Sequence, residues 1–167
     1  MTGVKRTPDQ IEPQTRSLIE QVLSGHKPWP ITLLGSVGTG KTSAALCVLD
    51  TLWPGVYLTV AEAMEELIQA QDGKLLKFDQ PCSPIRWWRR WCELPLTVLD
   101  EVGARDRISD FHYEVVNRCI DTRRDRPAVV VSNLNLGEID RIYDDRISSR
   151  LAAGTVITMT GKDRRIA

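Results

Sequence analysis

The sequence predicts an α/β fold in which a five-stranded parallel sheet lies between two layers of helices, a three-layer α-β-α sandwich. Short apolar runs alternate with helical patterns along the chain, which is typical of strands joined by crossover helices. The apolar runs are continuous, so we expect both faces of each strand to be covered. The 167 residues suffice for one domain, and 42% apolar with 26% charged residues is a globular composition.

The expected elements follow one another without repeats or low-complexity segments. Glycine and proline mark most of the breaks between them, for example Pro54–Gly55 and Pro127. We divide the chain into residues 1–29, an N-terminal arm and helix, and residues 30–167, a single core domain. Strands are expected at 31–34, 56–60, 96–99, 128–131 and 155–159. Helices are expected at 11–24, 41–52, 61–71, 84–93, 108–123 and 137–152, the last in two pieces, with a loop at 72–84.

The bulk composition narrows the classes of protein that fit. The 22 basic and 22 acidic residues cancel, so any nucleic-acid surface must be local. Most arginines lie at or after Arg86, and arginine suits forked recognition of phosphate. No apolar run approaches the length of a membrane span, and the N-terminus is polar. We expect a cytoplasmic protein without a membrane partner, with reduced core thiols at Cys47, Cys82, Cys92 and Cys119.

The segment Gly35–Thr42 matches the phosphate-binding P-loop pattern GxxxxGK[ST] in full, between an expected strand and an expected helix. Glycines allow the backbone amides to point at phosphate oxygens, and the helix N-terminus adds a positive dipole end. Lys41 would neutralise the β- and γ-phosphates and the Thr42 hydroxyl would hold Mg²⁺. The alternative is a glycine-rich turn that binds nothing. We predict ATP and Mg²⁺ as ligands, with nucleotide contacts from Gly35, Ser36, Val37, Gly38, Thr39, Gly40, Lys41, Thr42 and Ser43.

Two acids end the apolar run Leu96–Leu99. Asp100 is predicted to hold Mg²⁺ together with Thr42, and Glu101 to polarise the attacking water. The second acid and the intervening strand at 56–60 favour the additional-strand, catalytic-glutamate (ASCE) branch of P-loop ATPases. The alternative is a strand end that carries two solvated acids.

Two further blocks carry candidate catalytic residues. Asn133 follows the strand at 128–131, where it could reach the γ-phosphate or the lytic water, although asparagine is also common in plain turns. Arg146 and Arg150 are four residues apart on one helix face. We predict Arg150, with Arg146 as second candidate, as an arginine finger for a neighbouring subunit's nucleotide. The alternative, strongest for Arg146, is a salt bridge to Asp140, Asp144 or Asp145.

These four blocks, in this order, resemble AAA+ ATPases, and most of all the DnaC/IstB-like helicase-loader branch. The stretch from Tyr113 to Leu151, which contains strand-Ser-Asn and DRISSRL segments, is similar to that branch, and the match runs from about Pro30 to Arg165. The resemblance implies that Lys41 and Thr42 contact nucleotide and Mg²⁺, that Asp100 and Glu101 act in hydrolysis, that Asn133 is sensor 1 and that Arg150, with Arg146, is the trans finger.

The same resemblance implies an oligomeric ATPase that acts on DNA as a replicative helicase loader or replication accessory. Its partners would be other copies of the chain, single-stranded DNA and a replicative helicase. An IstB-type transposition regulator, which would act with a transposase, is an alternative within the same fold. A nucleotide-gated adaptor with little turnover is another, and a small-molecule kinase is disfavoured by Asp100, Glu101 and Asn133.

The chain also departs from this pattern. Branch members usually carry a longer region before the P-loop, and that region grips their partner. No room follows the strand at 155–159 for a helical lid, so we expect no C-terminal helical lid. Arg164 or Arg165 could replace a lid arginine, or could be solvated.

The segment Ile85–Trp91 interleaves tryptophan and arginine. Its rings could stack on bases of single-stranded DNA, or they could anchor a protein partner. A third interpretation is an amphipathic helix with Ile85, Trp88 and Trp91 in the core. Trp87 lies off that stripe, which makes it the candidate for binding.

Overall fold

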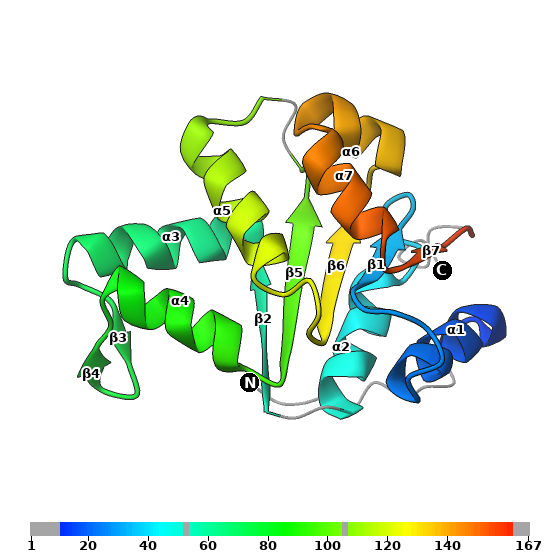
Figure 1. The fold of residues 1–167 in the computed structure, drawn as a ribbon, viewed down its shortest axis with the longest axis horizontal. Helices are drawn as coiled ribbons and strands as arrows, with labels where there is room; N and C mark the ends of the chain where they lie inside the picture. The colour runs from blue at the N-terminus through cyan, green and yellow to red at the C-terminus, as the bar shows by residue number, and fades with distance from the viewer. Residues whose placement is uncertain (1–10, 52–53, 105–106, 162–167) are drawn as a thin grey trace.

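Five parallel strands form the central sheet, as the sequence predicts, and their order is β2-β5-β6-β1-β7 (Figure 1). This computed structural model describes residues 11–51, 54–104 and 107–161. Strand β5 continues beyond the expected end at residue 99, through both acids. The strands are β1 (Ile31–Leu34), β2 (Gly55–Thr59), β5 (Leu96–Val102), β6 (Ala128–Ser132) and β7 (Thr155–Thr158).

The helices agree with the expected ranges to within a few residues, and the last range divides in two as expected. The one addition is a small antiparallel hairpin in the expected loop at 72–84, made of β3 (Leu76–Lys77) and β4 (Gln80–Pro81). The helices are α1 (Pro13–Leu23), α2 (Lys41–Thr51), α3 (Val60–Gln71), α4 (Pro84–Glu93), α5 (Asp110–Asp121), α6 (Leu136–Ile142) and α7 (Asp145–Ala152). Among the described residues, none of them is long and apolar enough to cross a membrane.

The sheet separates two apolar clusters, which gives the predicted three layers. Successive strand residues alternate between them, so Leu99 and Val130 face one cluster while Val98 and Val129 face the other. Helices α3 to α7 cover the first face, and α1 and α2 cover the second. Helix α1 thus shares its core with β1, and the division of the chain at residue 30 stays a prediction.

Strand β6 lies between β1 and β5. The strand that precedes the P-loop therefore does not neighbour the strand that ends in Asp100 and Glu101. This is the additional-strand arrangement that the sequence favoured. All five strands run in the same direction, so their carboxyl ends meet at one edge of the sheet (Figure 1).

Helix α4 buries a different face from the one predicted. Trp87 and Trp91 are the buried pair, 4% and 2% exposed, whereas Ile85 is 73% exposed. The two buried rings stack with centroids 5.5 Å apart, and each indole N–H has an acceptor, Glu66 Oε2 at 2.7 Å and the Cys119 carbonyl at 3.1 Å. The predicted stripe was wrong for Ile85, Trp88 is partly buried and packs against the core beside Trp91, and Trp87 is a core residue.

Candidate nucleotide-binding site

The loop between β1 and α2 has a backbone that only glycine accommodates easily. Gly35, Gly38 and Gly40 have φ angles of 140°, 83° and 91°. A Cβ atom on Gly35 would lie 2.1 Å from the carbonyl oxygen of Met159. The glycines of the sequence motif are therefore required by the fold of the loop itself.

Lys41 curls back over this loop from the first turn of α2. Its Nζ donates to the carbonyl oxygens of Gly35 and Ser36, each at 2.6 Å, and the residue is only 6% exposed. The Thr39 hydroxyl donates to the Ser36 carbonyl at 2.9 Å, which tightens the turn. The positive charge of Lys41 is thus held inside the loop, beside the N-terminus of α2. The ammonium group and the positive end of the helix dipole both favour binding of an anion there.

Asp100 is fixed beside the loop by three donors. Its Oδ2 accepts from the Thr42 hydroxyl at 2.9 Å and from the Tyr57 hydroxyl at 2.7 Å, and its Oδ1 accepts from the Glu101 amide at 2.6 Å. Asp100 is 4% exposed. Burial, together with the hydrogen bond to Asp100, raises the pKa of Tyr57, so the phenol stays a donor. The carboxylate therefore ties α2, β2 and β5 together.

The oxygens of Thr42 and Asp100 fit a magnesium ion. Both are hard oxygen ligands, and their separation of 2.9 Å brings an anionic and a neutral donor to one place beside the loop. The predicted metal pair is thus adjacent although the two residues are far apart in the sequence.

Glu101 has an unusual backbone. Its φ angle is +62°, a left-handed conformation that is uncommon for glutamate, and its side chain is exposed at the sheet edge. The register between β5 and β6 shifts between Leu99 and Val102, so the strand bulges at the two acids. Backbone strain of this kind is concentrated at functional sites.

Asn133 follows β6 at the same sheet edge. The preceding Ser132 is buried, and its hydroxyl donates to the Val102 carbonyl at 2.6 Å and accepts from the Leu134 amide at 3.1 Å. Ser132 thereby links the ends of β5 and β6. Asn133 itself is exposed and adjoins the strand end that carries the two acids.

The two arginines of α7 have different surroundings. Arg150 Nη1 donates to Asn117 Oδ1 at 2.6 Å, and its Nη2 lies 2.7 Å from Asp121 Oδ1, both on α5, with the side chain 11% exposed. Arg146 is exposed. Arg150 thus forms a salt bridge, as the alternative interpretation had it, but its partner is Asp121 rather than an acid considered from the sequence. The finger roles stay predictions, and Arg164 and Arg165 lie outside the described residues.

Sequence reasoning missed two tyrosines of this region. Tyr57 lies on β2 two residues before Thr59, whose register partner on β5 is Asp100. Its proximity to Asp100 follows only from the pairing of β2 with β5. The Tyr143 hydroxyl accepts from the Gly103 amide at 3.0 Å and pairs with His112 Nε2 at 2.9 Å. Burial raises the pKa of Tyr143 to about 12. This second tyrosine holds the chain directly after β5.

Comparison with known proteins gives one curated relative and many solved structures. No family model matches the chain. The relative is "Uncharacterized protein YdaV" of Escherichia coli (strain K12), 26% identical over 144 residues that cover 83% of this chain and 54% of the relative. The chain therefore spans about half the length of that protein.

The solved structures include replication initiators. DnaA from Aquifex aeolicus bound to AMPPCP superposes with a TM-score of 0.74 at 16% identity, over 98% of this chain and 53% of that one. DnaA bound to AMPPCP and single-stranded DNA gives 0.74 at 17% identity, over 96% and 51%. DnaI gives 0.65 at 20% identity, over 91% and 83%. The chain has the fold of the AAA+ P-loop domains of DnaA and DnaI.

Proposed function

We propose that this protein is an AAA+ ATPase that binds ATP and Mg²⁺ at the P-loop and hydrolyses the nucleotide. The observation that carries the proposal is the buried Asp100 carboxylate, hydrogen-bonded to the P-loop residue Thr42, with Glu101 next to it at the strand end. A solvated Asp100 would not be fixed in this way. The fold shared with DnaA bound to AMPPCP supports the same conclusion.

In this proposal each residue has a distinct role. Lys41 and the loop amides bind the phosphates, while Thr42 and Asp100 hold Mg²⁺, which neutralises phosphate charge when bound. Glu101 orients the attacking water and accepts its proton, and Asn133 holds the γ-phosphate or that water. Tyr57 is a positioning residue, because its hydroxyl fixes the Asp100 carboxylate.

For the biological role we propose a cytoplasmic replicative helicase loader or replication accessory. The fold is shared with DnaA bound to single-stranded DNA, which supports action on DNA. An IstB-type transposition regulator remains the alternative, and capture of a purified replicative helicase rather than a transposase distinguishes the two. A nucleotide-gated adaptor with little turnover is favoured by one observation, the contacts of Arg150 with its own subunit.

In an assembly, Arg150 or Arg146 of one subunit would complete the neighbour's site. The test measures ATPase rate against protein concentration, with and without single-stranded DNA. We expect the specific activity to rise with concentration and with DNA, and to collapse in Arg150→Ala. A flat rate that ignores DNA and the substitution would contradict the assembly. Loss of turnover in Glu101→Gln, with ATP binding retained, would exclude the adaptor.

Arg150→Ala also removes the ion pair with Asp121, so a matched control is needed. Asp121→Ala breaks the same pair and keeps the arginine, and we expect it to retain activity. Mixing inactive Arg150→Ala with inactive Lys41→Ala should restore turnover, because the second variant supplies an arginine to the nucleotide of the first. Equal losses in the Asp121 and Arg150 variants, with no recovery on mixing, would show that the arginine acts only within its own subunit.

A further inference from the structure

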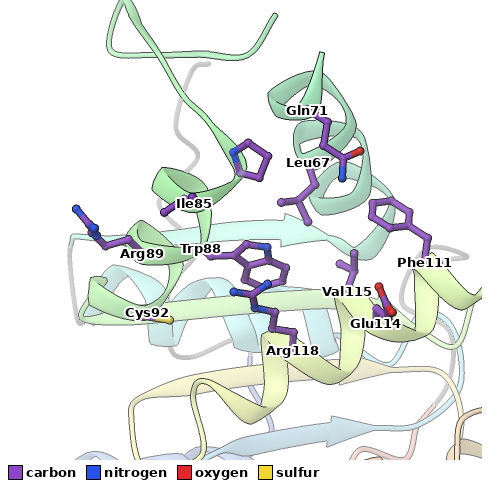
Figure 2. Close-up of a pocket in the computed structure, with 11 residues that line it drawn as sticks. Leu67, Gln71, Ile85, Trp88, Arg89, Cys92, Phe111, Glu114, Val115 and Arg118 are labelled. Atoms are coloured by element: carbon purple, nitrogen blue, oxygen red, sulfur yellow. The ribbon is translucent and has the colours of Figure 1, made fainter. Parts of the chain in front are cut away.

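A groove of about 450 Å³ lies between α3, α4 and α5, on elements that the nucleotide site does not use (Figure 2). Leu67, Trp88 and Val115 point toward one another across it. Its walls are mainly apolar, and they are formed by Leu67, Pro84, Ile85, Trp88, Phe111 and Val115.

This part of the molecule carries most of the exposed large apolar side chains. Apart from Val37 in the P-loop and Ile68 on α3 outside the groove lining, those of the described residues lie on the β3–β4 hairpin and on α4. Ile85, on the groove wall, is 73% exposed, and Phe78, at the tip of the β3–β4 hairpin, is 82% exposed with φ +53°. Exposed apolar surface that gathers beside a groove indicates an interaction site.

The charges around the groove are mostly positive. Arg89 and Arg118 line it, against the single carboxylate of Glu114. A partner with carboxylates would therefore be favoured at this rim, because arginine forks pair well with them.

The same geometry disfavours stacked nucleic-acid bases. Trp87 and Trp91 are buried, so two of the three rings of α4 offer no face to a base. The guanidinium of Arg118 lies 4.3 Å from the centre of the Trp88 ring and covers one side of it. What remains is a concave apolar floor, which fits the side chains of a helix better than a row of bases.

We propose that this groove binds an acidic amphipathic helix of a partner protein. Its apolar side chains pack against Ile85, Trp88 and Phe111, and its carboxylates pair with Arg89 and Arg118. The proposal does not depend on ATP hydrolysis, because the groove and the nucleotide site share none of these residues. A partner could thus be held while the P-loop turns over.

The test uses a panel of fluorescein-labelled amphipathic helical peptides, with leucine and phenylalanine on one face and glutamate on the other. Fluorescence anisotropy measures their affinity for the full chain. We expect saturable binding, with Ile85→Glu and Arg89→Glu each weakening it about tenfold or more. Ile68→Glu and Arg86→Glu place the same charges on α3 and α4 outside the groove, and should change affinity less than about twofold. Peptides with lysine for glutamate should bind about tenfold more weakly.

A spectroscopic measurement locates the binding. In ¹H–¹⁵N spectra the indole signal of Trp88 should shift on addition of peptide, while those of Trp87 and Trp91 stay. Absence of binding by every peptide, or equal losses in the Ile85 and Ile68 variants, would overturn the proposal. A shift of Trp88 caused by an oligothymidine but by no peptide would identify a nucleic-acid surface instead. Self-association abolished by Ile85→Glu would identify a second copy of the chain.

Discussion

Replacing Tyr57 with phenylalanine removes one hydroxyl group and keeps the ring in its place. The lost hydrogen bond is the one to Asp100 Oδ2 at 2.7 Å, whose acceptor is buried and charged. A hydrogen bond to a charged group contributes about 1.5–3 kcal/mol, and about 1.4 kcal/mol corresponds to a tenfold change in an equilibrium constant. If that energy serves to orient the carboxylate, Mg²⁺-dependent ATP binding should weaken about tenfold or more.

The assay compares binding of a fluorescent ATP analogue in Mg²⁺ and in excess chelator. In Tyr57→Phe the affinity without Mg²⁺ should stay the same, because Lys41 and the loop amides are untouched, and only the gain from Mg²⁺ should shrink. Tyr113→Phe is the matched control, since its hydroxyl also donates to a carboxylate, Asp144 at 2.6 Å, away from the P-loop. Equal losses with and without Mg²⁺ would refute the positioning role. Tighter Mg²⁺ binding would show that the Tyr57 hydroxyl competes with the ion.

Three further predictions concern stability and ionisation. Arg123, 1% exposed, donates to the carbonyls of Cys92 and Leu94 at the C-terminal end of α4, so Arg123→Leu should lower the free energy of unfolding by about 3 kcal/mol or more in urea titrations; a loss below about 1 kcal/mol would contradict this. The pKa values of Tyr57, Tyr113 and Tyr143 are all raised, so each phenol should ionise at a higher pH than an ordinary tyrosine, and their contribution to stability should be lost as the pH rises past 10.0; a tyrosine that ionises at its ordinary pKa in the folded protein would refute this. Gly35→Ala should destabilise the fold and abolish ATP binding, and a soluble variant with unchanged affinity would show that the loop can shift.

The central sheet was predictable because its signals are local. Each strand is a short apolar run that ends at a glycine or a polar residue, and every expected strand is present within a few residues. The end of β5 was less predictable, because Asp100 and Glu101 are charged. Asp100 pairs with Thr59 of β2, and a register shift against β6 carries the strand on to Val102. The hairpin at 76–81 was missed because its strands have two residues each, too short for any period.

Helix α4 shows how a local pattern can leave the buried face undecided. Its tryptophans allow one stripe through positions 88 and 91 and another through positions 87 and 91. The second is realised because Glu66, on α3, accepts the indole N–H of Trp87. Burying an indole without such an acceptor is costly, and no local pattern contains that partner.

By itself, the sequence determined the parts of this protein that are continuous in the chain. The eight residues from Gly35 to Thr42 match the P-loop pattern, and the turn that they form depends on the φ angles of their own glycines. Only the tertiary structure decided which distant groups meet: Tyr57 on Asp100, and Arg150 on Asp121. Those contacts depend on strand order and on the rotation of each helix against the sheet, and both are set by packing of the whole core rather than by neighbours in sequence.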